Sequence, residues 1–179
     1  MASFYGDDAS KSALVNAYDT LLPTIAPKHK ARLDREVGRN ISALAAYRDA
    51  ELILAYKFSR EEFDATAIIE QAKAEGKLIA YPKMARNGAI TYVLEDGSEP
   101  TEEQLAASLC FVPGLCFDAE GYRVAYGAGY MDNFLRSYEG VKVGLVRSLN
   151  ISSNPLPHGD HDERVDVLVS DSAVWMCRR

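Results

Sequence analysis

The sequence predicts an α/β protein with three layers, in which a mainly parallel sheet carries helices on both faces. Short apolar runs alternate with amphipathic helical patterns along most of the chain, and Pro, Gly or capping residues separate them. The 179 residues contain no internal repeat and no clear linker, which favours one domain over residues 1–179. In folds of this class the ligand binds beyond the C-terminal ends of the strands.

Helical patterns occur between the apolar runs. The pattern in the second helix rests on Leu33, Val37 and Ile41, which recur at helical spacing. Ser59 and Glu62 form a capping-box pattern that predicts the start of the third helix. The expected helices cover residues 11–22, 27–47, 59–74, a short segment from Thr101, and 128–138.

Apolar runs predict the strands. They cover residues 51–56, 77–81, 89–94, 109–112, 141–146 and 165–169. Pro82 is expected to close the second strand, because proline cannot donate to a central ladder. A long loop is expected after Pro113-Gly114. A second loop at 150–163 either covers an active site or only connects two elements.

Composition excludes several classes of function. The net charge of -6 disfavours a general binder of nucleic acid or of anionic membranes. No run approaches the roughly 20 apolar residues of a membrane span, and the N-terminus lacks the apolar core of a signal peptide, so a cytoplasmic protein is expected. The odd cysteine count, with Cys110, Cys116 and Cys177, fits reduced thiols. Small buried hydrophobes are favoured over a metal pair or redox couple.

A glycine-containing segment, Gly127 to Gly129, precedes a predicted helix. Small residues allow close backbone approach, and the first N–H groups of a helix are unpaired, which together suits a phosphate. A tight turn is the alternative. The spacing matches neither the dinucleotide fingerprint nor a Walker A loop.

Charged residues flank this segment on both sides. Asp132 falls in the first helical turn, where a carboxylate beside polyphosphate requires a cation such as Mg²⁺. The alternative is that it complements the helix dipole. Arg123 precedes the segment and could meet a phosphate. Its alternative is a surface ion pair with Asp118 or Glu120.

A second acidic group follows further along the chain. Asp166 opens a predicted strand and is either a second Mg²⁺ ligand or an ordinary polar start of that strand. His161 and Asp162 could carry a proton, but a hydrogen bond that tethers the loop is favoured for this pair.

From about Tyr56 to Ser170 the chain resembles the 5-formyltetrahydrofolate cyclo-ligase family. The resemblance rests on an ordered set of short motifs rather than on any single one. In order they are Glu62-Phe-Asp, Gly76-Lys77, Tyr81-Pro82, Glu99-Pro100, Val112-Pro-Gly, Phe117-Asp118, Gly121-x-Arg123, Gly127-x-Gly129-Tyr130-x-Asp132, Val143-Gly-Leu, Leu156-Pro157, and His161-Asp162 with Asp166.

The resemblance implies an ATP- and Mg²⁺-dependent enzyme that converts 5-formyltetrahydrofolate to 5,10-methenyltetrahydrofolate, with ADP and phosphate as the other products. It implies Arg123 and Tyr130 as catalytic residues and Asp132 and Asp166 as metal ligands. Substrate contacts are implied for Glu62, Phe117 and Met131. ATP contacts are implied for Lys11, Arg123, Gly127, Ala128, Gly129, Tyr130 and Asp132.

Several positions depart from the family pattern on the ligand side. Val15 stands where an Arg is usual, Ala65 replaces Thr, Ala125 replaces Gly, and Met131 replaces Tyr. These changes keep two alternatives open: a different ATP-dependent ligase or kinase on the same fold, or a non-catalytic folate- or nucleotide-binding protein. We expect a monomer with small-molecule partners and no nucleic-acid or membrane partner.

Overall fold

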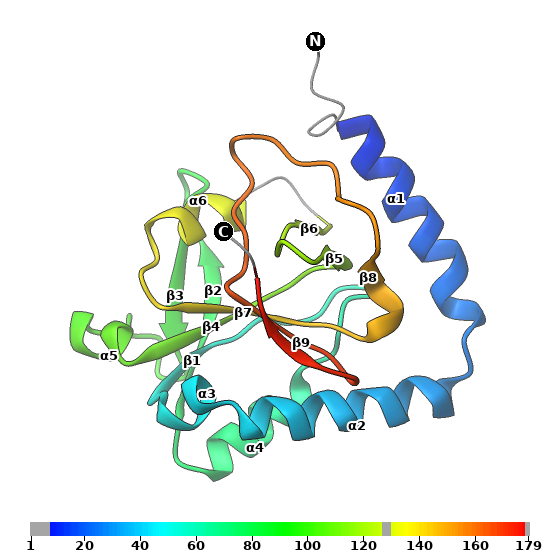
Figure 1. Ribbon diagram of the computed structural model, residues 1–179. Coiled ribbons are helices and arrows are strands. Elements are labelled where there is room, and N and C mark those ends of the chain that lie inside the picture. The colour runs from blue at the N-terminus through cyan, green and yellow to red at the C-terminus, as the bar shows by residue number, and fades with distance from the viewer. Residues whose placement is uncertain (1–7, 127–129, 178–179) are drawn as a thin grey trace.

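The computed structural model describes residues 8–126 and 130–177. Within these ranges seven strands form one sheet in the order β10-β9-β7-β4-β1-β2-β3 (Figure 1). Their bounds are β1 Leu52–Leu54, β2 Leu78–Met84, β3 Ile90–Leu94, β4 Ser108–Val112, β7 Val141–Leu145, β9 Val167–Val169 and β10 Val174–Met176. The inner pairs are parallel and only the edge strands β3 and β10 are antiparallel, which confirms the predicted mainly parallel sheet.

Helices cover both faces of this sheet (Figure 1). On one face α2 (Pro27–Ala43), α3 (Ala45–Asp49) and α4 (Thr66–Ala74) supply Val37, Tyr47 and Ile69 to a core that includes Ile53 and Phe111. On the other face α5 (Glu102–Ala106) and α6 (Tyr130–Ser137) pack through Leu105 and Leu135. The three predicted layers are therefore present.

A second, smaller sheet occupies the region where sequence predicted only a long loop. Among the described residues it has the order β6-β5-β8, with β5 Cys116–Asp118, β6 Arg123–Val124 and β8 Ile151–Ser152. The prediction failed because two- and three-residue strands leave no periodic pattern. The carboxylate of Asp118 accepts the N–H groups of Glu120 and Tyr122, so the β5–β6 turn carries Arg123 to a defined position.

The N-terminal helix α1 (Asp8–Leu21) packs on this small sheet rather than on the main one. Leu14, Val15 and Tyr18 contact a buried cluster that contains Cys116 and Val124. Val15, at the position where the family pattern suggests an arginine, is therefore a packing residue. Among the described residues, the remaining helical elements are two short 3-10 helices, Leu22–Thr24 and Ser148–Asn150.

The helix predicted from Ser59 begins only at Thr66. Only one of the two capping-box bonds forms: the Ser59 N–H donates to Glu62 Oε1, whereas the Glu62 N–H donates to the backbone carbonyl of Ser59 rather than to its hydroxyl. These two hydrogen bonds close a turn in which Arg60 has φ 51°, a conformation that does not continue into a helix. Asp64 precedes α4 instead, and its Oδ1 accepts the N–H and the hydroxyl of Thr66.

Strand β2 continues through Pro82, which was expected to end it. Pro82 pairs with Tyr92 of β3. Ala80, two residues earlier, faces the β1 side, where its carbonyl accepts the N–H of Ala55. β1 ends at Leu54, so among the described residues no strand lies opposite the Pro82 nitrogen, which has no hydrogen to donate. The predicted 27–47 helix is also divided, since Leu44 is extended between α2 and α3.

None of the helices within the described ranges has both the length and the apolar composition that crossing a bilayer requires.

Candidate functional site

A cavity of about 490 Å³ lies at the edge of the sheet where β1 and β4 end. This is the edge at which parallel α/β sheets bind their ligands, and the volume falls in the usual range for small-molecule sites. Its lining combines aromatic, apolar and charged side chains: Tyr56, Lys57, Glu62, Tyr81, Pro82, Lys83, Val93, Pro113, Tyr126 and Met131.

Glu62 is the buried carboxylate of this cavity. It is only 7% exposed, and its Oε1 accepts the Ser59 N–H at 2.8 Å. Burial raises the pKa of Glu62, and the Ser59 hydrogen bond and the charge of Arg123 oppose that shift. The segment is held in place because the Tyr56 hydroxyl donates to the carbonyl of Phe63 at 2.9 Å. A carboxylate held in this way can accept two N–H donors from a ligand.

Met131, on the first turn of α6, lies in the same cavity as Glu62. Its sulfur accepts from the hydroxyl of Tyr92 at 3.5 Å, and the Tyr92 ring packs on Phe134 with centroids 4.7 Å apart. These contacts join α6 to β3. The structure thus brings together two of the residues predicted to touch substrate, one polar and one apolar.

Arg123 and Asp132 form a mostly buried ion pair, with 7% and 12% of their side chains exposed. Arg123 Nη2 donates to Asp132 Oδ1 at 3.3 Å, and Nη1 donates to the Pro113 carbonyl at 3.0 Å. The alternative, a surface ion pair of Arg123 with Asp118 or Glu120, is therefore wrong. Asp132 Oδ1 also accepts the N–H of Glu163 at 3.1 Å.

This pair has unused capacity for a ligand. Arg123 Nε is buried without a hydrogen-bond partner in the described structure, and such a donor calls for an oxygen acceptor. Both bonds that Asp132 accepts from described residues end on Oδ1. The described residues contain no group of three His, Cys, Asp or Glu side chains able to hold a metal. One carboxylate oxygen together with phosphate oxygens is the arrangement that suits Mg²⁺.

Tyr130 begins α6 and is 41% exposed. Its ring lies close to Gly88, where an added Cβ would come within 3.3 Å of it. The residues predicted to cradle phosphate, Gly127, Ala128 and Gly129, lie outside the described residues. Their role therefore stays a prediction.

Tyr126, just before residues 127–129, contacts both α1 and the turn that contains Arg60. Its hydroxyl donates to Asp19 of α1, and the Arg60 guanidinium stacks over its ring at 4.2 Å. Arg60 also pairs with Asp19. Sequence reasoning missed this contact because Asp19 and Tyr126 are 107 residues apart and no local pattern connects them.

Lys11, a predicted ATP contact, pairs with Asp162 at 2.7 Å. Asp162 also accepts the Gly159 N–H at 2.9 Å. Partial burial alone would raise the pKa of Asp162, but the bonds from Lys11 and Gly159 outweigh it and lower that pKa. Asp162 therefore tethers its loop to α1, as the favoured interpretation predicted. A contact of Lys11 with ATP stays a prediction.

Asp166 lies immediately before β9, and its carboxylate accepts the Lys142 N–H at 3.0 Å. Lys142 of β7 pairs with Cys110 of β4. Cys110 lies three residues, or about 10 Å along the strand, before Pro113. The structure thus gives Asp166 a role at the start of β9, which was the alternative to a metal ligand. Its role in holding Mg²⁺ stays a prediction.

Phe117 was predicted to touch substrate, but its side chain is fully buried in β5. Its ring packs so closely on Gly114 and Gly144 that a Cβ at either position would lie within 2.8 Å of it. It is not among the residues that line the cavity. Its position agrees with a packing role beneath the site and not with direct contact.

Comparisons with known proteins bear on the family and the fold of this chain. A sequence model of the 5-formyltetrahydrofolate cyclo-ligase family matches residues 8–171. The chain belongs to this family. A 5-formyltetrahydrofolate cyclo-ligase of Saccharomyces cerevisiae is 36% identical over 86 residues, 44% of this chain and 40% of the yeast protein. The aligned segment thus spans about two fifths of that curated relative.

Solved structures extend the similarity of this cyclo-ligase family member to nearly the whole chain. A 5,10-methenyltetrahydrofolate synthetase from Aquifex aeolicus has a TM-score of 0.78 at 26% identity, covering 94% of this chain and 93% of that one. A 5,10-methenyltetrahydrofolate synthetase from Mycoplasma pneumoniae has a TM-score of 0.73 at 18% identity, covering 92% and 98%. The second match supports the fold alone.

Proposed function

We propose that the protein catalyses the ATP- and Mg²⁺-dependent closure of 5-formyltetrahydrofolate to 5,10-methenyltetrahydrofolate, with release of ADP and phosphate. The observation that carries this proposal is the cavity, whose lining includes the buried carboxylate of Glu62 and also Pro113, the residue whose carbonyl holds the guanidinium of Arg123. The Glu62 carboxylate suits the N–H edge of a pterin, and the Arg123 guanidinium suits phosphoryl oxygens. Family membership supports the same pairing of substrates.

At the folate end, Glu62 would accept two N–H groups of the pterin ring. The charge-assisted bonds are strong because the carboxylate is shielded from water. Met131, Pro113 and Tyr81 supply flat and apolar walls for the ring. This end orients the formyl group on N5 toward the pair formed by Arg123 and Asp132.

At the phosphate end, the formyl oxygen attacks the γ-phosphorus of ATP and ADP leaves. The Arg123 Nε–H, which has no protein acceptor among the described residues, would donate to an oxygen of the transferred group. Asp132 would hold Mg²⁺ through its remaining oxygen, and the ion would neutralise phosphate charge. Gly127, Gly129 and Tyr130 are proposed to contact the phosphates.

The second step closes the ring. N10 attacks the formyl carbon and loses its proton, and the former formyl oxygen leaves as phosphate. Phosphorylation converts a poor leaving group into a good one. The protein contributes position and charge stabilisation rather than covalent chemistry.

The test is an assay with purified protein, 5-formyltetrahydrofolate and Mg-ATP. We expect the near-ultraviolet absorbance of the methenyl product to increase, with one ADP formed per product. ATP hydrolysis without this product would favour a different ligase or kinase. A thermal shift by folate that ATP does not change, without turnover, would favour a binding protein. A ligand at a hundred times its Kd should stabilise by about 2.7 kcal/mol.

A further inference from the structure

We infer that the groove between α2 and α4 is a second ligand site, which takes a small anion with an apolar body. The groove has a volume of about 570 Å³, within the range of small-molecule sites. In the described chain, none of its lining residues also lines the cavity. It is lined by Asp34, Arg35, Gly38, Arg39, Ser42, Phe63, Asp64, Ala67, Ile68 and Gln71.

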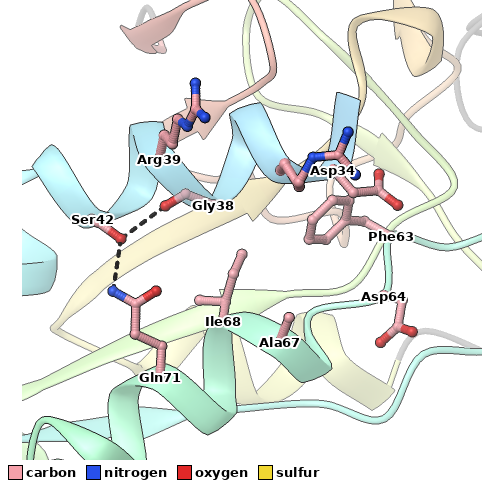
Figure 2. A pocket seen from close by; sticks show the side chains of 10 residues that line it. Asp34, Gly38, Arg39, Ser42, Phe63, Asp64, Ala67, Ile68 and Gln71 are labelled. Atoms are coloured by element: carbon pink, nitrogen blue, oxygen red, sulfur yellow. Dashed lines mark hydrogen bonds between the residues drawn. The ribbon is translucent and has the colours of Figure 1, made fainter. Parts of the chain in front are cut away.

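The floor of the groove is apolar. Figure 2 shows Phe63, Ala67 and Ile68 in the space between the two helices, with Ala67 and Ile68 pointing from α4 toward α2. Phe63 and Ile68 are 4% and 6% exposed. Opposite them α2 has Gly38, where a Cβ would come within 3.9 Å of Ile68 and fill part of the space. A floor of this kind favours an apolar ligand body.

A side-chain bridge joins the helices at one end of the groove (Figure 2). Gln71 Nε2 donates to Ser42 Oγ at 3.3 Å, and that hydroxyl donates to the Gly38 carbonyl at 2.8 Å. Because these polar groups form hydrogen bonds with one another, this end of the groove does not require a charged group on the ligand.

Both lining carboxylates are already engaged. Asp34 receives two hydrogen bonds from Arg147, at 2.6 and 2.9 Å. Asp64 Oδ1 accepts the N–H and hydroxyl of Thr66, at 2.9 and 2.5 Å. Neither therefore needs a ligand cation.

The two arginines that line the groove differ in whether they have a partner. Arg39 pairs with Glu36 at 2.9 Å, whereas Arg35 forms no hydrogen bond or ion pair with the described part of the chain. Arg35 is exposed beside the apolar floor, in a chain of net charge -6. An anionic group on an apolar body would satisfy Arg35 and bury the body against Phe63 and Ile68.

The groove and the cavity share one segment of backbone. Glu62 lines the cavity and its neighbour Phe63 lines the groove. The Phe63 carbonyl accepts from Tyr56, which also lines the cavity. The cavity and the groove therefore lie on opposite sides of this segment. Because a change in the groove could also disturb the cavity, the groove must be tested by binding rather than by turnover.

The test uses two dyes with the same apolar body. 8-Anilinonaphthalene-1-sulfonate carries a sulfonate, and N-phenyl-1-naphthylamine lacks it. We expect saturable fluorescence titration of the folded protein with the sulfonate, and about fivefold weaker binding of the neutral dye, as one partly exposed ion pair provides. Equal affinity for the two dyes would overturn the assignment of an anion.

Two variants and their matched controls locate the site. Ala67→Trp fills the groove and should abolish binding of the sulfonate, whereas Ala74→Trp, on the exposed end of α4 outside the groove, should not. Arg35→Glu should weaken the sulfonate about fivefold and leave the neutral dye unchanged. Arg48→Glu, the same charge change on α3, should affect neither. Unchanged sulfonate binding in Ala67→Trp or Arg35→Glu, with wild-type melting temperature, would overturn the site.

Discussion

Arg123 donates to Asp132 at 3.3 Å, and its Nε–H remains buried without a partner among the described residues. The same guanidinium is anchored by the carbonyl of Pro113, which directly follows β4. The main sheet and α6 therefore meet at one side chain. This relationship gives the proposed reaction a fixed positive group with one donor left for an oxygen of the substrate.

Arg123→Lys should lower kcat about 100-fold, because lysine cannot reproduce the fork of donors that stabilises phosphoryl charge. The KM for 5-formyltetrahydrofolate should change little. Steady-state kinetics at saturating Mg-ATP measures both. The control is Arg136→Lys, on the helix α6 that carries Asp132 but in a half-exposed pair with Glu163. Equal kcat losses in both variants would contradict a special role for Arg123.

Glu62→Gln should raise the KM for 5-formyltetrahydrofolate roughly 30-fold, because one charge-assisted hydrogen bond contributes about 2 kcal/mol. The KM for ATP should stay near that of the wild type. Initial rates with each substrate varied in turn separate the two effects. Glu70→Gln, on the exposed side of α4, is the control and should leave both constants unchanged. A rise in the KM for ATP alone would place Glu62 at the wrong end of the site.

Glu62 should also make stability depend on pH. Burial raises its pKa above the ordinary 4.5, so the folded state holds the proton more tightly than the unfolded state. Stability is therefore lost as pH rises from the ordinary value through the raised one. Urea unfolding of wild type and Glu62→Gln between about pH 4 and about pH 7 should show a stability difference that moves against the wild type as pH rises.

Asp96 provides the opposite sign as a control. The Ser98 hydroxyl and N–H hydrogen bonds lower the pKa of Asp96, so its contribution is present above its ordinary value and is lost as pH falls. The wild type should gain relative to Asp96→Asn as the pH rises toward the ordinary value of 3.8, so these two proteins are compared below about pH 4. Parallel trends in the two variants would show that the measured slopes do not come from these groups.

Gly121→Ala should destabilise the fold by about 3 kcal/mol. Gly121 has φ 91°, and an added Cβ would lie 2.5 Å from the Val165 carbonyl, which is backbone and cannot give way. Gly76→Ala is the matched control, with φ 86° and nothing within 4 Å, and should cost only about 1 kcal/mol. Equal losses in urea unfolding would show that positive φ alone accounts for the cost at Gly121.

The Lys11–Asp162 pair should couple α1 to the 153–164 loop weakly. A double-mutant cycle with Lys11→Ala and Asp162→Ala should give a coupling free energy of about 0.5 kcal/mol at low salt, because both side chains are partly exposed. The coupling should shrink at 1 M salt, as screening of exposed charges requires. A coupling that does not respond to salt would indicate packing rather than charge.

Most of the main sheet could be predicted from sequence because buried parallel strands are continuous apolar runs, as in Leu52–Leu54 and Leu109–Val112. The small sheet could not, since β6 and β8 are two residues long. The start of α4 was misplaced because the Ser59–Glu62 pattern satisfies a turn as well as a helix cap.

By itself, the sequence determined the fold class and the family, because period, punctuation and motif order are local properties of a chain. It also identified Glu62, Arg123, Asp132 and Met131 as residues of interest. Only the tertiary structure decided their partners. Asp132 rather than Asp118 pairs with Arg123, Phe117 is packed beneath the site, and Asp19 reaches Tyr126. Such contacts depend on how strands and loops are arranged in space, and no spacing along the chain encodes that arrangement.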